Sequence, residues 1–405
     1  MANTFKFGNG NWAVKDGYAL AYNDENNNFK PLPFDFTRAS SATTLNKQGL
    51  IETVGSGKPR IDFTDNTSGH LLLEPSRMNK LVRSNEFNTT WTLGSALTLT
   101  SGQTSTLTGN SDSWLLSSNG TSGFSALTQA VSISGSHTYS IFAKKGTNDL
   151  ISLRSLSGAD ARAEFNLNTG VLNSTSNTSS TEIKSYGNGW YRISMTFSAS
   201  NSFVYVYPNS IGVADAGNIY IQNAQIEAAS YATSYIPTEG SNVTRIAETG
   251  IDCLLPNETI INNSTATVYL EFEALVNDLS NRWISFEELG VPTDNMFEIR
   301  LSAGSNLLQI VTRSSGGGQD VVMSETLTDI TANNKIAVNY NGLNWKLAVN
   351  GTIADTETAA RLFNDNIEKI KFSRNTNTNH FYGKVKDLKV YNTALTDTEL
   401  QNLTS

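Results

Sequence analysis

Hydrophobic and polar residues alternate along two long stretches of the chain, residues 86–240 and residues 263–405. A period of two places successive side chains on opposite faces of a β-strand, so each stretch predicts strands with one buried and one solvated face. In the first stretch, Gly, Ser and Asn separate the alternating segments, which favours an antiparallel sandwich or jelly roll. Its clearest predicted strands are 139–143, 150–154, 163–167, 190–197, 203–207 and 219–222.

The second stretch repeats this pattern and adds a strong turn signal at Asn350-Gly351. A two-residue type I′ turn needs positive φ at both central residues, which Asn-Gly tolerates best, so 345–349 should pair with the strand that follows. Thr396 and Glu399 fit a capping box that begins a short terminal helix. The other predicted strands are 268–274, 283–286, 297–301, 307–312, 335–340 and 367–372.

Residues 1–85 and 241–262 show little alternation and are punctuated by Gly, Pro and Asn. This pattern favours short strands and ordered loops. We therefore predict an all-β chain. An N-terminal attachment segment (1–85) precedes two antiparallel β-sandwich (jelly-roll) domains, 86–240 and 263–405, which residues 241–262 link.

Composition supports this fold class and excludes several functions. Asn, Ser and Thr number 45 each among 405 residues, and they favour turns and exposed strand faces over helices. The net charge is only -8 and Lys and Arg form no stripe, so we expect no nucleic-acid partner. No apolar run reaches the about 18 residues of a membrane span, so we expect no membrane insertion. Met1–Gly8 lacks a signal-peptide core, and the single Cys253 excludes an internal disulfide.

Several ordered motifs carry a resemblance to known families. Residues 36–43, 49–51, 58–63 and 71–77, with Asn79, resemble bacteriophage virion and tail-fibre proteins. Residues 186–194, 224–227 and 232–238, with Arg245, resemble the closing signature of their carbohydrate-binding-module-like jelly roll. Residues 381–391 and 394–400 resemble the end of a laminin-G or concanavalin A-like lectin domain. The resemblance implies a virion location, other virion proteins as partners, and a homo-oligomer, with a trimer favoured.

Five charged residues of the N-terminal segment lie in stretches bounded by Pro and Gly. Arg–carboxylate pairs could fasten such loops, which lack regular ladders. We expect this charge network to hold the segment together, without a catalytic role. Its members are Arg38, Arg60, Asp62, Glu74 and Arg77.

Residues for catalysis or metal binding are hard to find. His70, His137 and His380 are scattered without zinc-ligand or triad spacing, so we expect no metal site and no cofactor, although calcium stays open. Glu271 and Glu273 share one strand face, as paired glycosidase carboxylates can. Because Leu275 stands where a further acid would be expected, a solvated strand face explains these residues better.

Aromatic side chains near turns are the better functional candidates, because sugar rings pack on them. Trp114 and Trp283 lie in polar surroundings and are the predicted carbohydrate-binding platforms. Trp12, Trp91 and Trp345 have apolar neighbours or lie on a strand beside a turn, and are expected in cores or interfaces.

These observations predict a non-enzymatic phage virion protein, a tail fibre or similar appendage, that binds bacterial surface polysaccharide. It would be made in the host cytoplasm and act on the virion, outside the cell. Two alternatives stay open. One is a purely structural or decorating virion protein that makes protein–protein contacts. The other is a polysaccharide-degrading enzyme.

Overall fold

The fold is built almost wholly of antiparallel β-strands, which confirms the predicted all-β class. The computed structural model describes residues 3–20, 33–157, 159–254, 261–290, 295–302, 306–314, 318–361, 363 and 365–405. In these ranges the only helix is α1 (Asp397–Thr404), and none is long and apolar enough to cross a membrane.

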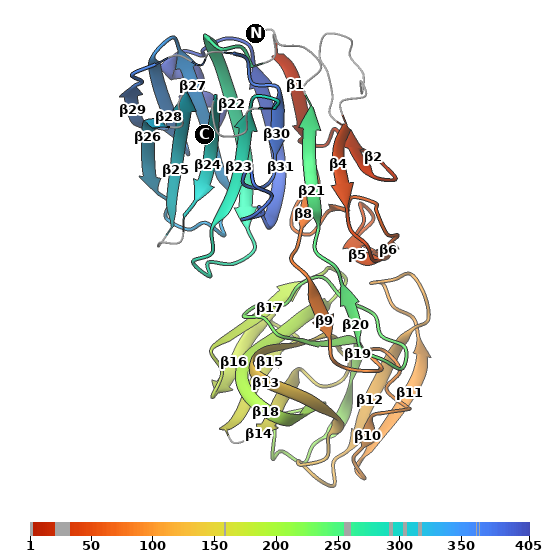
Figure 1. Ribbon diagram of the computed structural model, residues 1–405. Helices are drawn as coiled ribbons and strands as arrows, with labels where there is room; N and C mark the ends of the chain where they lie inside the picture. The colour runs from red at the N-terminus through yellow and green to blue at the C-terminus, as the bar shows by residue number, and fades with distance from the viewer. Residues whose placement is uncertain are drawn as a thin grey trace. The chain divides into compact units, whose positions relative to one another are not determined.

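The chain forms two compact units that are interleaved along the sequence (Figure 1). Unit 1 holds the described residues of Met1–Ser41, Val54–Pro75 and Ala247–Ser405, and unit 2 holds Ala42–Thr53 and Ser76–Ile246. This division differs from the predicted order of segment, domain, linker and domain. The first 85 residues supply strands to both units, because their short strands pair with partners far along the chain.

Unit 1 contains two sheets. The first runs in the order β29 (Thr352–Thr358), β28 (Asn344–Val349), β27 (Asn334–Asn341), β22 (Thr265–Ala274), β31 (Gly383–Tyr391), β8 (His70–Leu73) and β7 (Ile61–Asp62), and β1 (Asn3–Gly8) also pairs with β31. The second runs in the order β2 (Ala13–Lys15), β3 (Tyr18–Leu20), β4 (Pro33–Thr37), β21 (Thr249–Leu254), β30 (Lys369–Lys371), β23 (Arg282–Glu287), β24 (Met296–Leu301), β25 (Leu307–Ser314) and β26 (Gly318–Thr326).

Alternating apolar side chains from both sheets form one core in unit 1. Val268, Leu270 and Phe272 of β22 pack in the same cluster as Ile284 and Phe286 of β23. Glu271 and Glu273 therefore lie on the outer face of β22, as the alternation predicted.

Local turn and cap signals of unit 1 are confirmed. Asn350 and Gly351 both have positive φ (45° and 84°), and they join β28 to β29 in the predicted hairpin. Thr396 and Glu399 form the capping box of α1. Leu395 and Leu400 then pack with Tyr269, Ala337 and Ala348 on the outer side of the first sheet.

Unit 2 is a jelly roll built around two long strands, β13 (Leu127–Lys145) and β18 (Trp190–Tyr207). The first half of β18 pairs with β17 (Ser180–Ser185) and the second half with β14 (Leu150–Ser157). The full order is β11 (Leu97–Gln103), β12 (Ser113–Asn119), β19 (Ala216–Glu227), β13, β18, β14, β15 (Ala159–Asn166) and β16 (Val171–Ser176), with β10 (Thr92–Leu93) beside β13. Two small pairs, β5 (Ala42–Leu45) with β6 (Ile51–Val54) and β9 (Arg77–Asn79) with β20 (Val243–Arg245), complete the strands.

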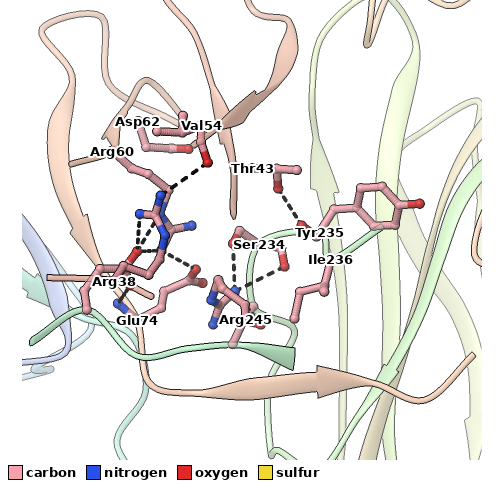
Figure 2. Close-up of polar contacts among 12 residues, drawn as sticks. Arg38, Thr43, Val54, Arg60, Asp62, Glu74, Ser234, Tyr235, Ile236 and Arg245 are labelled. Atoms are coloured by element: carbon pink, nitrogen blue, oxygen red, sulfur yellow. Dashed lines mark hydrogen bonds and ion pairs between the residues drawn. The ribbon is translucent and has the colours of Figure 1, made fainter. Parts of the chain in front are cut away.

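A buried charge network in unit 1 centres on Glu248. Its Oε1 accepts hydrogen bonds from Arg38 Nη1 (3.1 Å) and Arg60 Nε (2.8 Å), and its Oε2 accepts one from the backbone N–H of Glu74 (2.8 Å). Arg60 Nη2 also lies 2.8 Å from Glu74 Oε2. All four residues are almost completely buried, so these two positive and two negative charges pair inside the protein. Figure 2 shows Arg38, Arg60 and Glu74 of this network.

The charge balance explains why Arg60 stays protonated. Burial disfavours a guanidinium, but the nearby carboxylates of Glu248 and Glu74 outweigh that effect and raise the pKa of Arg60. Glu248 was not among the residues predicted from the sequence, although it completes the network.

The other two predicted members of the network have different roles. Asp62 lies close enough to Arg60 to favour its charge, but its Oδ1 accepts a hydrogen bond from the Thr64 N–H (2.9 Å) and lies 3.6 Å from His70 Nε2. Arg77 belongs to unit 2, where its guanidinium lies 5.8 Å from the ring centroid of Tyr231. The expectation of one five-residue network was wrong for Arg77, because the chain passes into unit 2 after Pro75.

We expect Glu248→Gln to destabilise unit 1 strongly. The amide removes the carboxylate that both buried arginines share, and breaking a buried ion pair costs about 3–5 kcal/mol. Denaturant unfolding of the full chain measures this loss. Asp16→Asn is the matched control, since it breaks an exposed pair with Lys58 that contributes about 0–1 kcal/mol. Equal unfolding midpoints for Glu248→Gln and Asp16→Asn would show that the network is dispensable.

Candidate functional site

Trp114, the first predicted sugar platform, is half-buried and packs against the core of unit 2. Its indole lies on β12 and packs edge-to-face against Phe87, with ring centroids 6.1 Å apart. Its Nε1–H donates a hydrogen bond to the carbonyl of Asn85 (2.8 Å). The indole therefore fixes the segment before β10 and is not the exposed platform that we expected.

Trp283, the second predicted platform, is covered by cations. The guanidinium of Arg300 on the adjacent strand β24 lies 4.3 Å from its ring centroid, and that of Arg374, which follows β30, lies 4.7 Å away. Cation–π contacts of this kind stabilise the outer face of the second sheet of unit 1. They also occupy the ring surface that a sugar would need.

An aromatic stripe on β18 fits a binding role better. Phe203, Tyr205 and Tyr207 point to the outer face of the sheet, because Val204 and Val206 between them are fully buried in the core of unit 2. Phe203 is 49% exposed, Tyr205 is half-buried and Tyr207 is 3% exposed. The ring centroids of Tyr205 and Tyr207 lie 6.1 Å apart with an interplanar angle of 17°.

An ion-paired cluster borders the stripe. Arg154 lies opposite Tyr205 on β14, with its guanidinium 5.7 Å from the Tyr205 ring centroid. Its Nε and Nη2 donate to the two oxygens of Asp160 (2.7 and 3.0 Å), and Nη1 donates to the Tyr207 hydroxyl (3.3 Å). Arg162 pairs with the same carboxylate. Asp160 thus separates two arginines that face each other across β14 and β15.

Further polar and apolar groups complete this surface. Leu156, 42% exposed, lies opposite Phe203. Glu164 accepts hydrogen bonds from the Ser152 hydroxyl (3.2 Å) and from the Asn173 amide. We call the surface formed by Phe203, Tyr205, Tyr207, Leu156, Arg154, Asp160 and Glu164 the β18 face.

The β18 face has the composition of a saccharide-binding surface. Apolar and aromatic side chains can pack against the C–H faces of sugar rings, and the neighbouring arginines, carboxylates and amides can bond hydroxyls. Sequence reasoning predicted the strand 203–207 but missed the site. The signal was the spacing of three aromatic residues at every second position, with valines between them.

The two carboxylates on β22 that resemble a glycosidase pair, Glu271 and Glu273, both bond to neighbouring side chains of unit 1. Glu271 accepts hydrogen bonds from the Asn333 amide (2.9 Å) and the Tyr269 hydroxyl (3.2 Å). Glu273 forms ion pairs with Lys384 (2.9 Å) and Lys386. Burial alone would raise the pKa of Glu273, but the two lysines outweigh it and lower the pKa. A lowered pKa opposes a role as general acid.

The three histidines are dispersed. His70 is buried in unit 1, and its burial lowers its pKa to about 4. Burial also lowers the pKa of His137 and of His380. Within the part of the chain that the structure describes, no group of three or more His, Cys, Asp or Glu side chains could hold a metal ion.

The C-terminal part of the chain is similar to a known family. Residues 248–401 match the model of the Concanavalin A-like lectin/glucanases superfamily. Among curated proteins, no sequence matches the chain at a significant level.

Similar solved structures include the CBM40 module of a Ruminococcus gnavus IT-sialidase bound to α2,3-sialyllactose (14% identity, TM-score 0.31, 36% of this chain and 85% of that chain). The heptameric SAP-like pentraxin of Limulus polyphemus has 11% identity and a TM-score of 0.31 over 36% of this chain and 72% of that chain. The binding domain of botulinum neurotoxin serotype G has 14% identity and a TM-score of 0.32 over 38% and 39%. Sequence identities and TM-scores this low do not indicate function, so the function is inferred from the geometry of the site.

The ion-paired cluster makes a titration prediction. Hydrogen bonds from Arg162 and Arg154 lower the pKa of Asp160 from 3.8 to about 2. Because the folded pKa is depressed, ionised Asp160 stabilises the fold above its unfolded value, and this contribution is lost as the pH falls toward 2. An NMR titration of the Asp160 carboxyl should give a midpoint near 2.

Removing one arginine should shift that midpoint. In Arg162→Gln the titration midpoint of Asp160 should rise toward 3.8, because Arg162 contributes the larger of the two effects that lower the pKa of Asp160. The control Lys145→Gln removes a cation that pairs with Asp149, and it should leave the midpoint of Asp160 unchanged. An unchanged midpoint in Arg162→Gln would mean that the pairing seen here does not hold in solution.

Proposed function

We propose that the chain is a non-enzymatic virion protein of a bacteriophage, a tail fibre or similar appendage, that binds glycans of the host surface. The observation that carries the glycan-binding part is the β18 face, where aromatic side chains stand outward beside a fixed set of polar groups. A strand that only served the core would place large aromatic rings inside. At residues 203–206, β18 instead places Val204 and Val206 inside and the rings of Phe203 and Tyr205 outside.

Two further observations support this proposal. The lectin-like fold of residues 248–401 is a second β-sandwich of a type that carries saccharide sites. The ordered motifs of residues 36–79 and 186–245 resemble phage virion and tail-fibre proteins. Such appendages are oligomeric, and we propose a homo-oligomer, a trimer by the resemblance. Several weak sites on one particle then act together through multivalency.

The glycan-binding part predicts a loss of affinity in two variants. In the full chain, Phe203→Ala and Tyr205→Ala should each weaken binding to host surface polysaccharide about tenfold, equivalent to about 1.4 kcal/mol. Phe124→Ala is the matched control, because Phe124 is 72% exposed in unit 2 but is not part of the β18 face. Binding is measured on an array of polysaccharides from candidate host strains.

Two outcomes would contradict this part of the proposal. Unchanged polysaccharide binding in both variants would show that the binding site is not the β18 face. An array on which the wild type binds no polysaccharide, together with an assembly structure in which neighbouring subunits cover the β18 face, would favour the purely structural role.

The non-enzymatic part makes its own prediction. The wild-type chain should release no reducing sugar from polysaccharides that it binds, because the lowered pKa of Glu273 removes the general acid from the one carboxylate pair suggested by the sequence. A reducing-end assay on bound polysaccharide measures this. Release by the wild type that disappears in Glu273→Gln would identify the chain as an enzyme.

A further inference from the structure

A polar groove lies on the outer side of the first sheet of unit 1, beside the segment that leads into α1. Its volume is about 810 Å³, within the about 300–1,000 Å³ typical of ligand pockets. Its floor is formed by residues of β27, β28 and β29, and its wall by residues 394–396. Neither of the predicted carbohydrate-binding residues, Trp114 and Trp283, lines it.

The pleat of the strands explains the polar floor. Val338 and Tyr340 of β27 and Leu347 of β28 face the core, so the residues between them face outward. Cross-strand pairing then creates two rows of outward residues. One row is Asn339, Lys346 and Thr356, and the other is Asn341, Asn344 and Thr358.

The wall of the groove is fixed before any ligand arrives. The Asn339 amide donates a hydrogen bond to the carbonyl of Leu395 (2.6 Å), and the Leu395 N–H donates to the Thr267 hydroxyl (3.1 Å). Lys346 forms an ion pair with Asp397 at the start of α1. The capping box and the apolar contacts of α1 hold the same segment. A preorganised wall lowers the entropic cost of binding.

Two amides of the floor are available to a ligand. Asn341 and Asn344 are exposed, and their side chains form no hydrogen bond with any residue that the structure describes. An amide carries both a donor and an acceptor, so it can bond two neighbouring hydroxyls of one sugar ring.

The chemistry of the lining selects among ligand classes. Asp397 neutralises Lys346, no arginine lines the groove, and the carboxylate of Glu357 does, so a phosphate or sulfate group would lack a paired cation and would be repelled. The floor offers amides and hydroxyls in place of apolar pockets for peptide side chains. A neutral saccharide matches this lining.

We infer that this groove is a second saccharide site, which takes a short neutral oligosaccharide through the amides of Asn341 and Asn344. The inference rests on the proposed function, since it assigns a further site to a glycan-binding chain. The two sites differ in chemistry, because the β18 face is aromatic and charged and the groove is an amide and hydroxyl surface. Each copy of the chain then holds two sites, one in each unit.

The test uses the full chain and three neutral probes, maltotriose, cellotriose and chitotriose. Saturation-transfer NMR detects binding and calorimetry measures the affinity. At least one probe should bind, and Asn341→Ala/Asn344→Ala should weaken it at least tenfold. Asn88→Ala/Asn110→Ala, which removes two asparagine side chains of unit 2 outside both sites, should bind like the wild type. Unchanged thermal unfolding of the groove variant confirms that the fold is intact.

The result is separable from the proposed function. Tyr205→Ala should keep the trisaccharide affinity, because the β18 face lies in the other unit. The groove inference is overturned if none of the probes binds at the solubility limit or if the groove variant binds like the wild type. In either case, loss of polysaccharide binding in Tyr205→Ala would leave the proposed function standing.

Discussion

The ion pairing of Glu248 is the constraint on which unit 1 depends. Its carboxylate holds two buried guanidinium groups that are 22 residues apart in the chain and lie about two hundred residues before it. Glu248 is the carboxylate that both arginines share, and it offsets part of the cost of several kcal/mol that burying their charges carries. The Glu74 N–H bonds the same carboxylate, so the segments around residues 38, 60, 74 and 248 must all be in place together.

This constraint explains which features could be predicted from the sequence. The strands, the Asn350-Gly351 hairpin and the capping box at Thr396 follow from local patterns, and the structure confirms them. The pairing of β1 with β31, or of β4 with β21, joins residues hundreds of positions apart, and no local pattern encodes it. The predicted domains are therefore continuous stretches of sequence, whereas each compact unit combines segments that are joined by long-range strand pairing.

The candidate site shows the same limit. On β18 both faces carry apolar residues, so alternation alone does not tell which face is buried, and large aromatic rings are usually expected inside. The polar neighbours of Trp283 in the sequence suggested exposure, but Arg300 and Arg374, which are distant in the sequence, cover the ring with their cations. The Asn-rich groove is formed by three strands and a distant wall, and it exists only after those elements assemble.

The interleaved order of the two units has a consequence for how the chain is made on the ribosome. Unit 2 ends at Ile246, so all its strands have been synthesised before most of unit 1 exists. Strand β1 is synthesised before unit 2, but it pairs with β31 (Gly383–Tyr391), which is synthesised after it. The nascent chain therefore carries the apolar side chains of β1, Phe5 and Phe7, without their final cover until β31 has been made. Unit 2 can fold while this happens, whereas unit 1 closes only after β31 has emerged.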